Sequence, residues 1–146
     1  MKTNGSPRYP EFPKEEFERR WSRARDMMKT REIDALMVTE EINYSYFSGH
    51  YLNGLGSFYG KTRPLVFLLP LDDEPTLILN GFMRGDAFKR SWVRNIESWV
   101  EVPFTVSCVT KVLREQGLEE SRIGVEFGLE QRIEMPYEEF QRLRSD

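Results

Sequence analysis

The stretch IDALMVT, residues 33–39 of a chain of 146, decides the fold. Within it, residues 35–38 form a continuous apolar run between Asp34 and Thr39. A short unbroken run of this kind is typical of a strand that is buried on both faces of a sheet. The stretch therefore predicts a central strand, and the segments before and after it are expected to cover its two faces.

The segment before this strand predicts an amphipathic helix from Pro13 to about Thr30, because proline is favoured at the first helical position. Its apolar residues recur at spacings of four, three and four, on one face of a helix: Phe17, Trp21, Ala24 and Met28. The basic residues between them predict a solvated face rather than a nucleic-acid contact: Arg19, Arg20, Arg23, Arg25 and Lys29. Residues 1–12 show no periodicity and are expected to form an N-terminal arm before one domain over residues 13–146.

The segments after the strand predict a short helix, a loop and a hairpin. Residues 41–48 are expected to be helical and to end before Gly49. Residues 49–64 contain four glycines, which indicates a long loop. The apolar runs at residues 65–69 and 76–79 are separated by an acidic turn, and together they predict two antiparallel strands.

The C-terminal half alternates predicted helices and strands. Helices are expected over residues 82–91, from Pro103 to Gly117 and over residues 136–144, and strands within residues 93–100 and 123–125. Phe82 and Phe88 are expected to be inward contacts of the first of these helices, and the last carries Tyr137, Phe140 and Leu143 at three-residue steps. Such alternation indicates an α/β fold in which helices cover the faces of a sheet.

Composition argues against several classes of protein. The 24 acidic and 21 basic residues give a net charge of −3, whereas a nucleic-acid-binding domain needs a concentrated basic surface. The longest apolar run, residues 65–69, is far shorter than the roughly 20 residues of a membrane helix. Cys108 is the one cysteine, and its place in an apolar stripe predicts a buried structural thiol. The N-terminus does not resemble a signal peptide, so we expect a cytoplasmic protein with no nucleic-acid or membrane partner.

Catalytic motifs are scarce. Catalytic zinc sites usually use two or three histidines, and His50 is the one histidine of the chain. The sequence has no H-E-x-x-H, D-x-D-x-D-G or G-x-S-x-G motif, and its loop glycines lack the dinucleotide-binding spacing. We therefore expect no catalytic residue, metal or cofactor in this chain, and a His50 that is solvated or locally hydrogen-bonded. A small enzyme with a carboxylate cluster of Asp34, Glu40 and Glu126 is an alternative.

Residues 53–64 combine glycines with aromatic and basic side chains, among them Tyr59, Lys61 and Arg63. A flexible segment of this composition can present a ring and a positive charge to a ligand or partner. An ordinary surface loop with solvated charges has the same composition. The residues alone leave both interpretations open.

The order of motifs resembles the N-terminal domain of the creatinase/prolidase family, the pita-bread metallopeptidases that include Xaa-Pro aminopeptidases. The resemblance extends from about Glu16 to Arg144 and is carried by five pieces in the family's order. These are F-x-x-R at residues 17–20 with Met28, IDALMVT at 33–39, NYSYFSG at 43–49, RP at 63–64 with the strand to Pro70, and IGVE at 123–126.

The resemblance implies a ribonuclease-H-like mixed sheet of about five to six strands, flanked by helices and placed before a separate catalytic domain. In the family that catalytic domain usually holds two divalent metals, although the creatine-hydrolysing branch works without metal. The catalytic pita-bread domain is expected to be absent from this chain. The implied function is non-catalytic: dimer assembly, and substrate access at a neighbouring subunit's active site. The expected partners are a second copy of the chain or the family's catalytic domain, and a free-standing interaction module with the same fold is the alternative.

Creatine hydrolases of the family place an aromatic-Gly-Arg stretch before the second long strand, where it reaches the substrate across the subunit boundary. The matching residues here are Tyr59, Gly60 and Lys61. The resemblance therefore implies substrate contacts in trans from Tyr59, Lys61, Arg63 and His50. Lysine lacks the planar fork with which arginine binds a carboxylate, which favours an Xaa-Pro peptide over creatine as the parent's substrate.

The chain departs from the family at the end of its first helix. Glu32 stands where the family usually has glycine. Since glycine most readily adopts left-handed backbone, this helix is expected to end without the usual left-handed cap.

Overall fold

The computed structural model describes residues 5–51, 64–100, 104 and 106–145. Its strands are β1 (Ala35–Val38), β2 (Val66–Pro70), β3 (Thr76–Asn80), β4 (Asn95–Trp99) and β5 (Ile123–Gly124). Its helices are α1 (Lys14–Thr30), α2 (Glu41–Ser48), the 3-10 turn η1 (Gly81–Met83), α4 (Arg84–Arg90), α5 (Ser107–Glu115) and α6 (Tyr137–Ser145). None of these helices is both long enough and apolar enough to span a bilayer.

The strands form one mixed sheet in the order β4-β3-β2-β1-β5. The neighbours β1, β2 and β3 are antiparallel, whereas β5 joins β1 and β4 joins β3 in parallel. The predicted hairpin of β2 and β3 is confirmed, and so is the mixed α/β sheet of five to six strands. The IDALMVT strand lies inside the sheet, where Leu36 is opposite Leu69 of β2 and Gly124 of β5.

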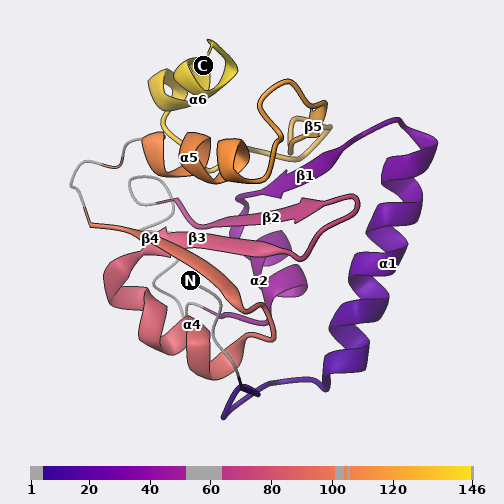
Figure 1. Cartoon of the computed structure of the whole chain (residues 1–146), viewed down its shortest axis with the longest axis vertical. Coiled ribbons are helices and arrows are strands. Elements are labelled where there is room, and N and C mark those ends of the chain that lie inside the picture. The colour runs from indigo at the N-terminus through magenta and orange to yellow at the C-terminus, as the bar shows by residue number, and fades with distance from the viewer. Residues whose placement is uncertain (1–4, 52–63, 101–103, 105, 146) are drawn as a thin grey trace.

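Each face of the sheet carries its own apolar core, because side chains of a strand alternate between the faces. On one face, Val38 and its neighbours on β2 and β3 pack against α1, α2 and α4. On the other face, Met37 and its neighbours pack against α5 and α6. Figure 1 shows α5 and α6 above the sheet and α4 below it, so β1 is covered as the sequence predicts.

The structure confirms the predicted apolar stripe of α1 and differs from the prediction in the burial of one basic residue. Phe17, Trp21 and Met28 are buried, and Ala24 packs against the same core. Arg20, expected on the solvated face, is buried as well.

The burial of Arg20 has a clear cause in the N-terminal arm and α2. Its guanidinium lies over the rings of Phe12, Phe17 and Tyr46, at 4.3–5.0 Å from the ring centroids. It also donates a 2.8 Å hydrogen bond to Glu16 and another to the Tyr46 carbonyl. Two arginines hold the pKa of the Glu16 carboxyl down at about 2, Arg19 foremost and Arg20 second. A cation with these partners needs no exposure to water.

One predicted inward contact, Phe82, is wrong. Phe82 is 62% exposed, because helix α4 begins with a 3-10 turn that instead buries Met83 and, a turn later, Ala87. Tyr137 is 75% exposed at the start of α6, whereas Phe140 is buried.

Some apolar predictions are confirmed in part. Phe88 and Leu143 pack at the edges of the two cores. Cys108 on α5 is half-buried against the second core rather than fully buried. Pro103, the predicted start of α5, lies outside the described residues.

The expectation that α1 ends without a left-handed cap is wrong. Glu32 has φ +54°, in the left-handed region. Its backbone N–H donates to the Lys29 carbonyl at 3.3 Å, and that of Ile33 donates to Met28 at 3.0 Å. These two bonds define a Schellman motif, in which apolar contact between residues such as Ile33 and Met28 closes the helix end. The geometry of the motif therefore forces glutamate into a conformation that favours glycine.

We predict that Glu32→Gly raises the free energy of unfolding by about 0.5–1 kcal/mol, because it removes left-handed strain at the cost of some chain entropy. The exposed 3.1 Å ion pair of Glu32 with Arg122 is lost, but such pairs contribute little. Urea unfolding measures the change. Gly117→Ala is the matched control, since Gly117 has φ +67° at the end of α5, and this variant should lose stability. Equal stability of wild type and Glu32→Gly would contradict the prediction.

Candidate functional site

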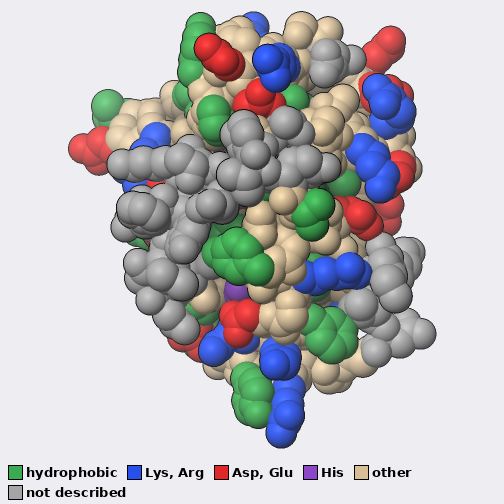
Figure 2. Space-filling view, turned by 90° about the vertical axis from the view of Figure 1, so that its left-hand side faces the viewer, with side chains coloured by type: hydrophobic (Ala, Val, Ile, Leu, Met, Phe, Trp, Pro, Cys, Tyr) green, Lys and Arg blue, Asp and Glu red, His purple; other side chains and the backbone are tan. Residues whose placement is uncertain are grey.

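His50 lies directly after α2, at the root of the segment that carries the predicted substrate contacts. Gly49 ends α2 with φ +70° and donates its N–H to the Ser45 carbonyl at 2.9 Å. A Cβ atom at Gly49 would come within 2.7 Å of the Phe17 ring, so both conformation and space require glycine here. The turn directs the His50 side chain inward, where it is 1% exposed. In Figure 2 only a small part of the purple imidazole can be seen.

Both ring nitrogens of His50 have partners. Nδ1 lies 2.9 Å from the hydroxyl of Tyr44 on α2, and Nε2 lies 3.2 Å from a carboxylate oxygen of Asp86 on α4. The carboxylate can only accept, so Nε2 carries the proton and Tyr44 donates to Nδ1. Of the two environments expected for this histidine, the structure shows the hydrogen-bonded one. Its contact with a substrate in trans stays a prediction.

Electrostatics keep this imidazole neutral near pH 7. Burial lowers the pKa of His50 and outweighs the Asp86 carboxylate, which raises it, while Arg90 lowers it slightly further. Arg90 also binds Asp86 at 3.0 Å. Burial raises the pKa of Tyr44, whose ring is fully enclosed. The arrangement joins α2 to α4 through a neutral ring and is suited to holding the backbone at residue 50 in place.

We predict that this histidine makes the fold sensitive to acid. Because its folded-state pKa is below the ordinary 6.5, the unfolded chain binds the extra proton first. The stabilisation that neutral His50 gives the folded state is therefore complete above pH 6.5 and is lost as the pH falls below that value. When unfolding takes up one proton, the free energy of unfolding falls by up to about 1.4 kcal/mol for each unit by which the pH is lowered.

Urea unfolding of wild type and His50→Gln between pH 7.5 and 5.5 measures this slope. The chain has no second histidine, so any difference in slope over that range belongs to this residue. Glutamine can still donate to Asp86 but does not titrate. Parallel pH profiles for the two proteins would contradict the prediction.

The other predicted contacts in trans lie outside the described residues. These are Tyr59, Lys61 and Arg63. The structure therefore describes where their segment begins, at Tyr51, and where it ends, at Pro64. Burial and the Glu11 carboxylate of the N-terminal arm raise the pKa of the Tyr51 hydroxyl.

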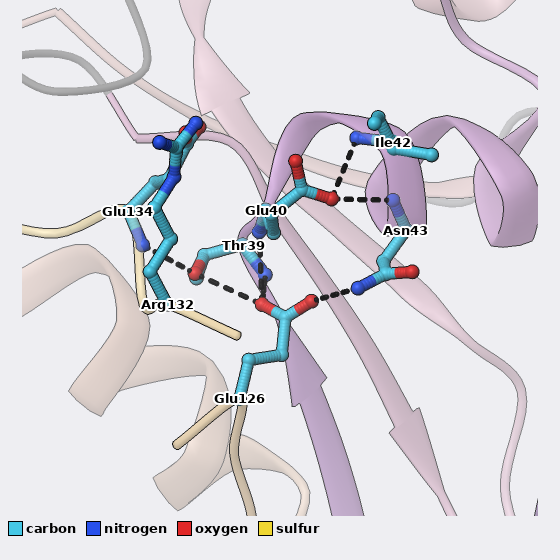
Figure 3. Close-up of polar contacts among 7 residues, drawn as sticks. All are labelled: Thr39, Glu40, Ile42, Asn43, Glu126, Arg132 and Glu134. Atoms are coloured by element: carbon cyan, nitrogen blue, oxygen red, sulfur yellow. Dashed lines mark hydrogen bonds and ion pairs between the residues drawn. The ribbon is translucent and has the colours of Figure 1, made fainter. Parts of the chain in front are cut away.

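A second polar cluster surrounds the N-terminus of α2 and is centred on Glu126 (Figure 3). One carboxylate oxygen of Glu126 accepts the backbone N–H groups of Thr39 and Glu40 at 2.7 and 2.8 Å, and the Thr39 hydroxyl lies 3.2 Å from it. The other accepts from the Asn43 side-chain amide at 2.8 Å. The Glu40 carboxylate caps the same helix, accepting from the N–H groups of Ile42 and Asn43. The Glu40 carboxylate thus binds donors that the first turn of α2 leaves unsatisfied, and the Glu126 carboxylate binds the backbone immediately before that turn.

The segment after β5 closes this cluster. The N–H of Glu134 donates to the Thr39 hydroxyl at 2.8 Å, and its carboxylate pairs with Arg132 at 2.7 Å. Burial raises the pKa of the Glu134 carboxyl, and Arg132 opposes the shift. Figure 3 shows residues from two distant parts of the sequence meeting at one end of β1.

The alternative carboxylate cluster does not assemble. Asp34 lies at the opposite end of β1 from Glu40 and Glu126, and it accepts the Arg122 N–H at 2.7 Å. Within residues 5–51, 64–100, 104 and 106–145, no three or more His, Cys, Asp or Glu side chains form a group that could hold a metal ion. Sequence reasoning assigned Glu126 no role in holding the start of α2, and no local signal could reveal one, because its partners are 83–87 residues away.

Fold and clusters together define an α/β domain whose described polar groups join helices to the sheet. The family model of the creatinase/prolidase N-terminal domain matches residues 20–146. The chain belongs to this family, as the order of its motifs indicated. It is 30% identical over 128 residues to creatinase from Bacillus sp. (strain B-0618), covering 86% of this chain and 29% of that protein.

Solved structures show the same fold. The N-terminal domain of Xaa-Pro dipeptidase from Lactobacillus brevis aligns with a TM-score of 0.69 at 8% identity, covering 86% of each chain. Dipeptidase PepE from Mycobacterium ulcerans aligns with a TM-score of 0.66 at 16% identity, over 92% of this chain and 33% of that one. The chain therefore spans about a third or less of the creatinase and of this dipeptidase.

Proposed function

We propose that this chain is the non-catalytic N-terminal domain of a creatinase/Xaa-Pro peptidase-type hydrolase. In that role it contributes to dimer assembly and to substrate access at a neighbouring subunit's active site. The observation that carries the proposal is the family match over residues 20–146, in a chain that corresponds to 29% of creatinase. Its partners would be a second copy of itself or a catalytic domain of the family, in the cytoplasm.

The described site supports this proposal through the root of the 52–63 segment. His50 is held from three sides, because its N–H donates to Ser48 at 3.0 Å, its carbonyl accepts from Ser45 at 3.2 Å, and its ring binds Tyr44 and Asp86. A segment that presents side chains to a neighbouring active site needs a fixed origin. We propose Tyr59, Lys61 and Arg63 as its substrate contacts, with His50 as a fourth contact from the root of the segment. This chain would bind no cofactor itself, and any catalytic metals would lie in the catalytic domain.

Two assays test the proposal. The purified chain, incubated with alanyl-proline and either Mn²⁺ or Co²⁺, should release no proline above the blank. Turnover that copurifies with the chain would overturn its non-catalytic assignment.

The second assay uses a protein that carries this chain in front of a catalytic domain. There, Lys61→Ala should raise KM for the peptide several-fold with a smaller change in kcat, because it removes a charge that binds substrate. Lys29→Ala is the matched control, since Lys29 is an exposed lysine on α1, and its kinetics should be unchanged. If the Lys61→Ala variant has the same KM and kcat as wild type, the proposed substrate-access role is wrong.

A further inference from the structure

A groove of about 370 Å³ lies between α1, β1 and α2, on the first core's side of the sheet. Its walls are largely apolar. Met28 is buried at its floor, Met27 is exposed, and the other apolar residues are partly buried: Ala24, Ile33, Leu36 and Phe47. Leu36 belongs to β1, yet unlike its neighbours on that strand it is not fully covered. The groove therefore exposes apolar surface that the chain's own described helices leave open.

The groove is rimmed by positive charge. Arg20, Arg23 and Arg31 line it, and no acidic side chain does. Arg20 is engaged by Glu16 and the Tyr46 carbonyl. Arg23 and Arg31 are exposed and form no ion pair with another described residue. An occupant of matching chemistry combines an apolar side chain with a carboxylate.

A turn after β5 has this chemistry. The Gln131 N–H donates to the Gly128 carbonyl at 3.1 Å, which closes a turn with Leu129 and Glu130 at its tip. Leu129 is 94% exposed. Glu130 has φ +59°, in the left-handed region where a turn favours glycine, and its carboxylate has no partner among the described residues. Strain of this kind, carried by a residue with an unused charge, motivates a hypothesis of function.

The turn cannot reach the groove of its own chain. Phe127, at its base, packs against Phe140 with ring centroids 5.1 Å apart, on the face of the sheet covered by α5 and α6. The groove lies on the opposite face, beside Met28 and Phe47 of the first core. A second copy of the chain can supply the turn.

We propose that two copies of this chain associate by inserting Leu129 of each into the groove of the other, with Glu130 pairing with Arg31 and Arg23. The proposal deepens the dimer-assembly part of the proposed function and rests on it. Apolar burial in the groove supplies attraction, and the charge pairing sets the register.

Charge reversal tests the pairing. Arg31→Glu alone and Glu130→Arg alone each place like charges together, and each should weaken self-association at least about tenfold in sedimentation equilibrium. An equimolar mixture of the two variants restores opposite charges at both contacts, and its affinity should return to near the wild-type value. Lys29→Glu, a reversal on α1 outside the groove, is the matched control and should leave association unchanged.

Glu130→Gly separates association from folding. Glycine relieves the left-handed strain, so this variant should unfold at the same or a higher urea concentration while it loses dimer affinity. A dimer that is insensitive to the reversals and to Glu130→Gly overturns the groove proposal but leaves self-association intact. A wild-type chain that stays monomeric at about 1 mM, in the range of weak association, overturns the groove and self-association together. The substrate-access role is tested separately by the Lys61 kinetics.

Discussion

Glu126→Ala is expected to lower the free energy of unfolding by about 3–5 kcal/mol, because a buried acceptor of several donors disappears. The backbone N–H groups of Thr39 and Glu40 and the amide of Asn43 lose their partner at once. Thr39 is buried, so water cannot replace the carboxylate there without opening the end of β1. The loss is a large part of the roughly 5–15 kcal/mol that stabilises a typical domain. Urea unfolding, followed by far-UV circular dichroism, measures it.

Glu126→Gln is the informative control. The amide oxygen can still accept from Thr39 and Glu40, while the new NH₂ faces the amide of Asn43. Asn43 satisfies that donor by turning its own amide to present oxygen. The glutamine variant should therefore cost only about 1–2 kcal/mol, mainly the charge assistance of the bonds. Equal losses for alanine and glutamine would mean that the negative charge at α2, and not the hydrogen bonds, is what stabilises the fold.

The parts of the fold that the sequence predicted are those encoded in local periodicity. The burial of Phe17, Trp21 and Met28 follows from their spacing on α1. The covering of β1 on both faces of the sheet follows from its unbroken apolar run. Gly49 and Gly117 mark helix ends because few other residues adopt their conformations.

The parts that the sequence missed depend on partners far away in the chain. Arg20 is buried because rings of the arm and α2 surround it, and the partner of His50 is Asp86 on another helix. Glu32 is a local exception: the closing bonds of α1 to Lys29 and Met28 fix its backbone in the left-handed region, against its intrinsic preference. Neither composition nor spacing contains the contacts of Arg20 and His50, since both are created by tertiary packing.

Trp21→Ala is the second change for which we expect a large effect. The side chain is 5% exposed and packs with Phe17, so its removal leaves a cavity in the first core. Its indole N–H also donates to the Phe47 carbonyl at 2.9 Å, which ties α1 to α2. Loss of a buried tryptophan of this kind costs about 3–5 kcal/mol. Urea unfolding should show the loss, and Lys29→Ala on the exposed face of the same helix should stay within about 0.5 kcal/mol of wild type.

Trp21→Phe divides this effect into packing and hydrogen bonding. Phenylalanine keeps most of the apolar ring but leaves the Phe47 carbonyl without its indole donor. An unsatisfied buried acceptor costs about 1–3 kcal/mol, so this variant should fall between wild type and alanine. Because Phe47 lies three residues before His50, losing this bond should also loosen the root of the 52–63 segment, and amide exchange at Gly49 and His50 should accelerate. Unchanged exchange there, with stability reduced, would show that the indole contributes to the core alone and that α2 holds the segment independently of α1.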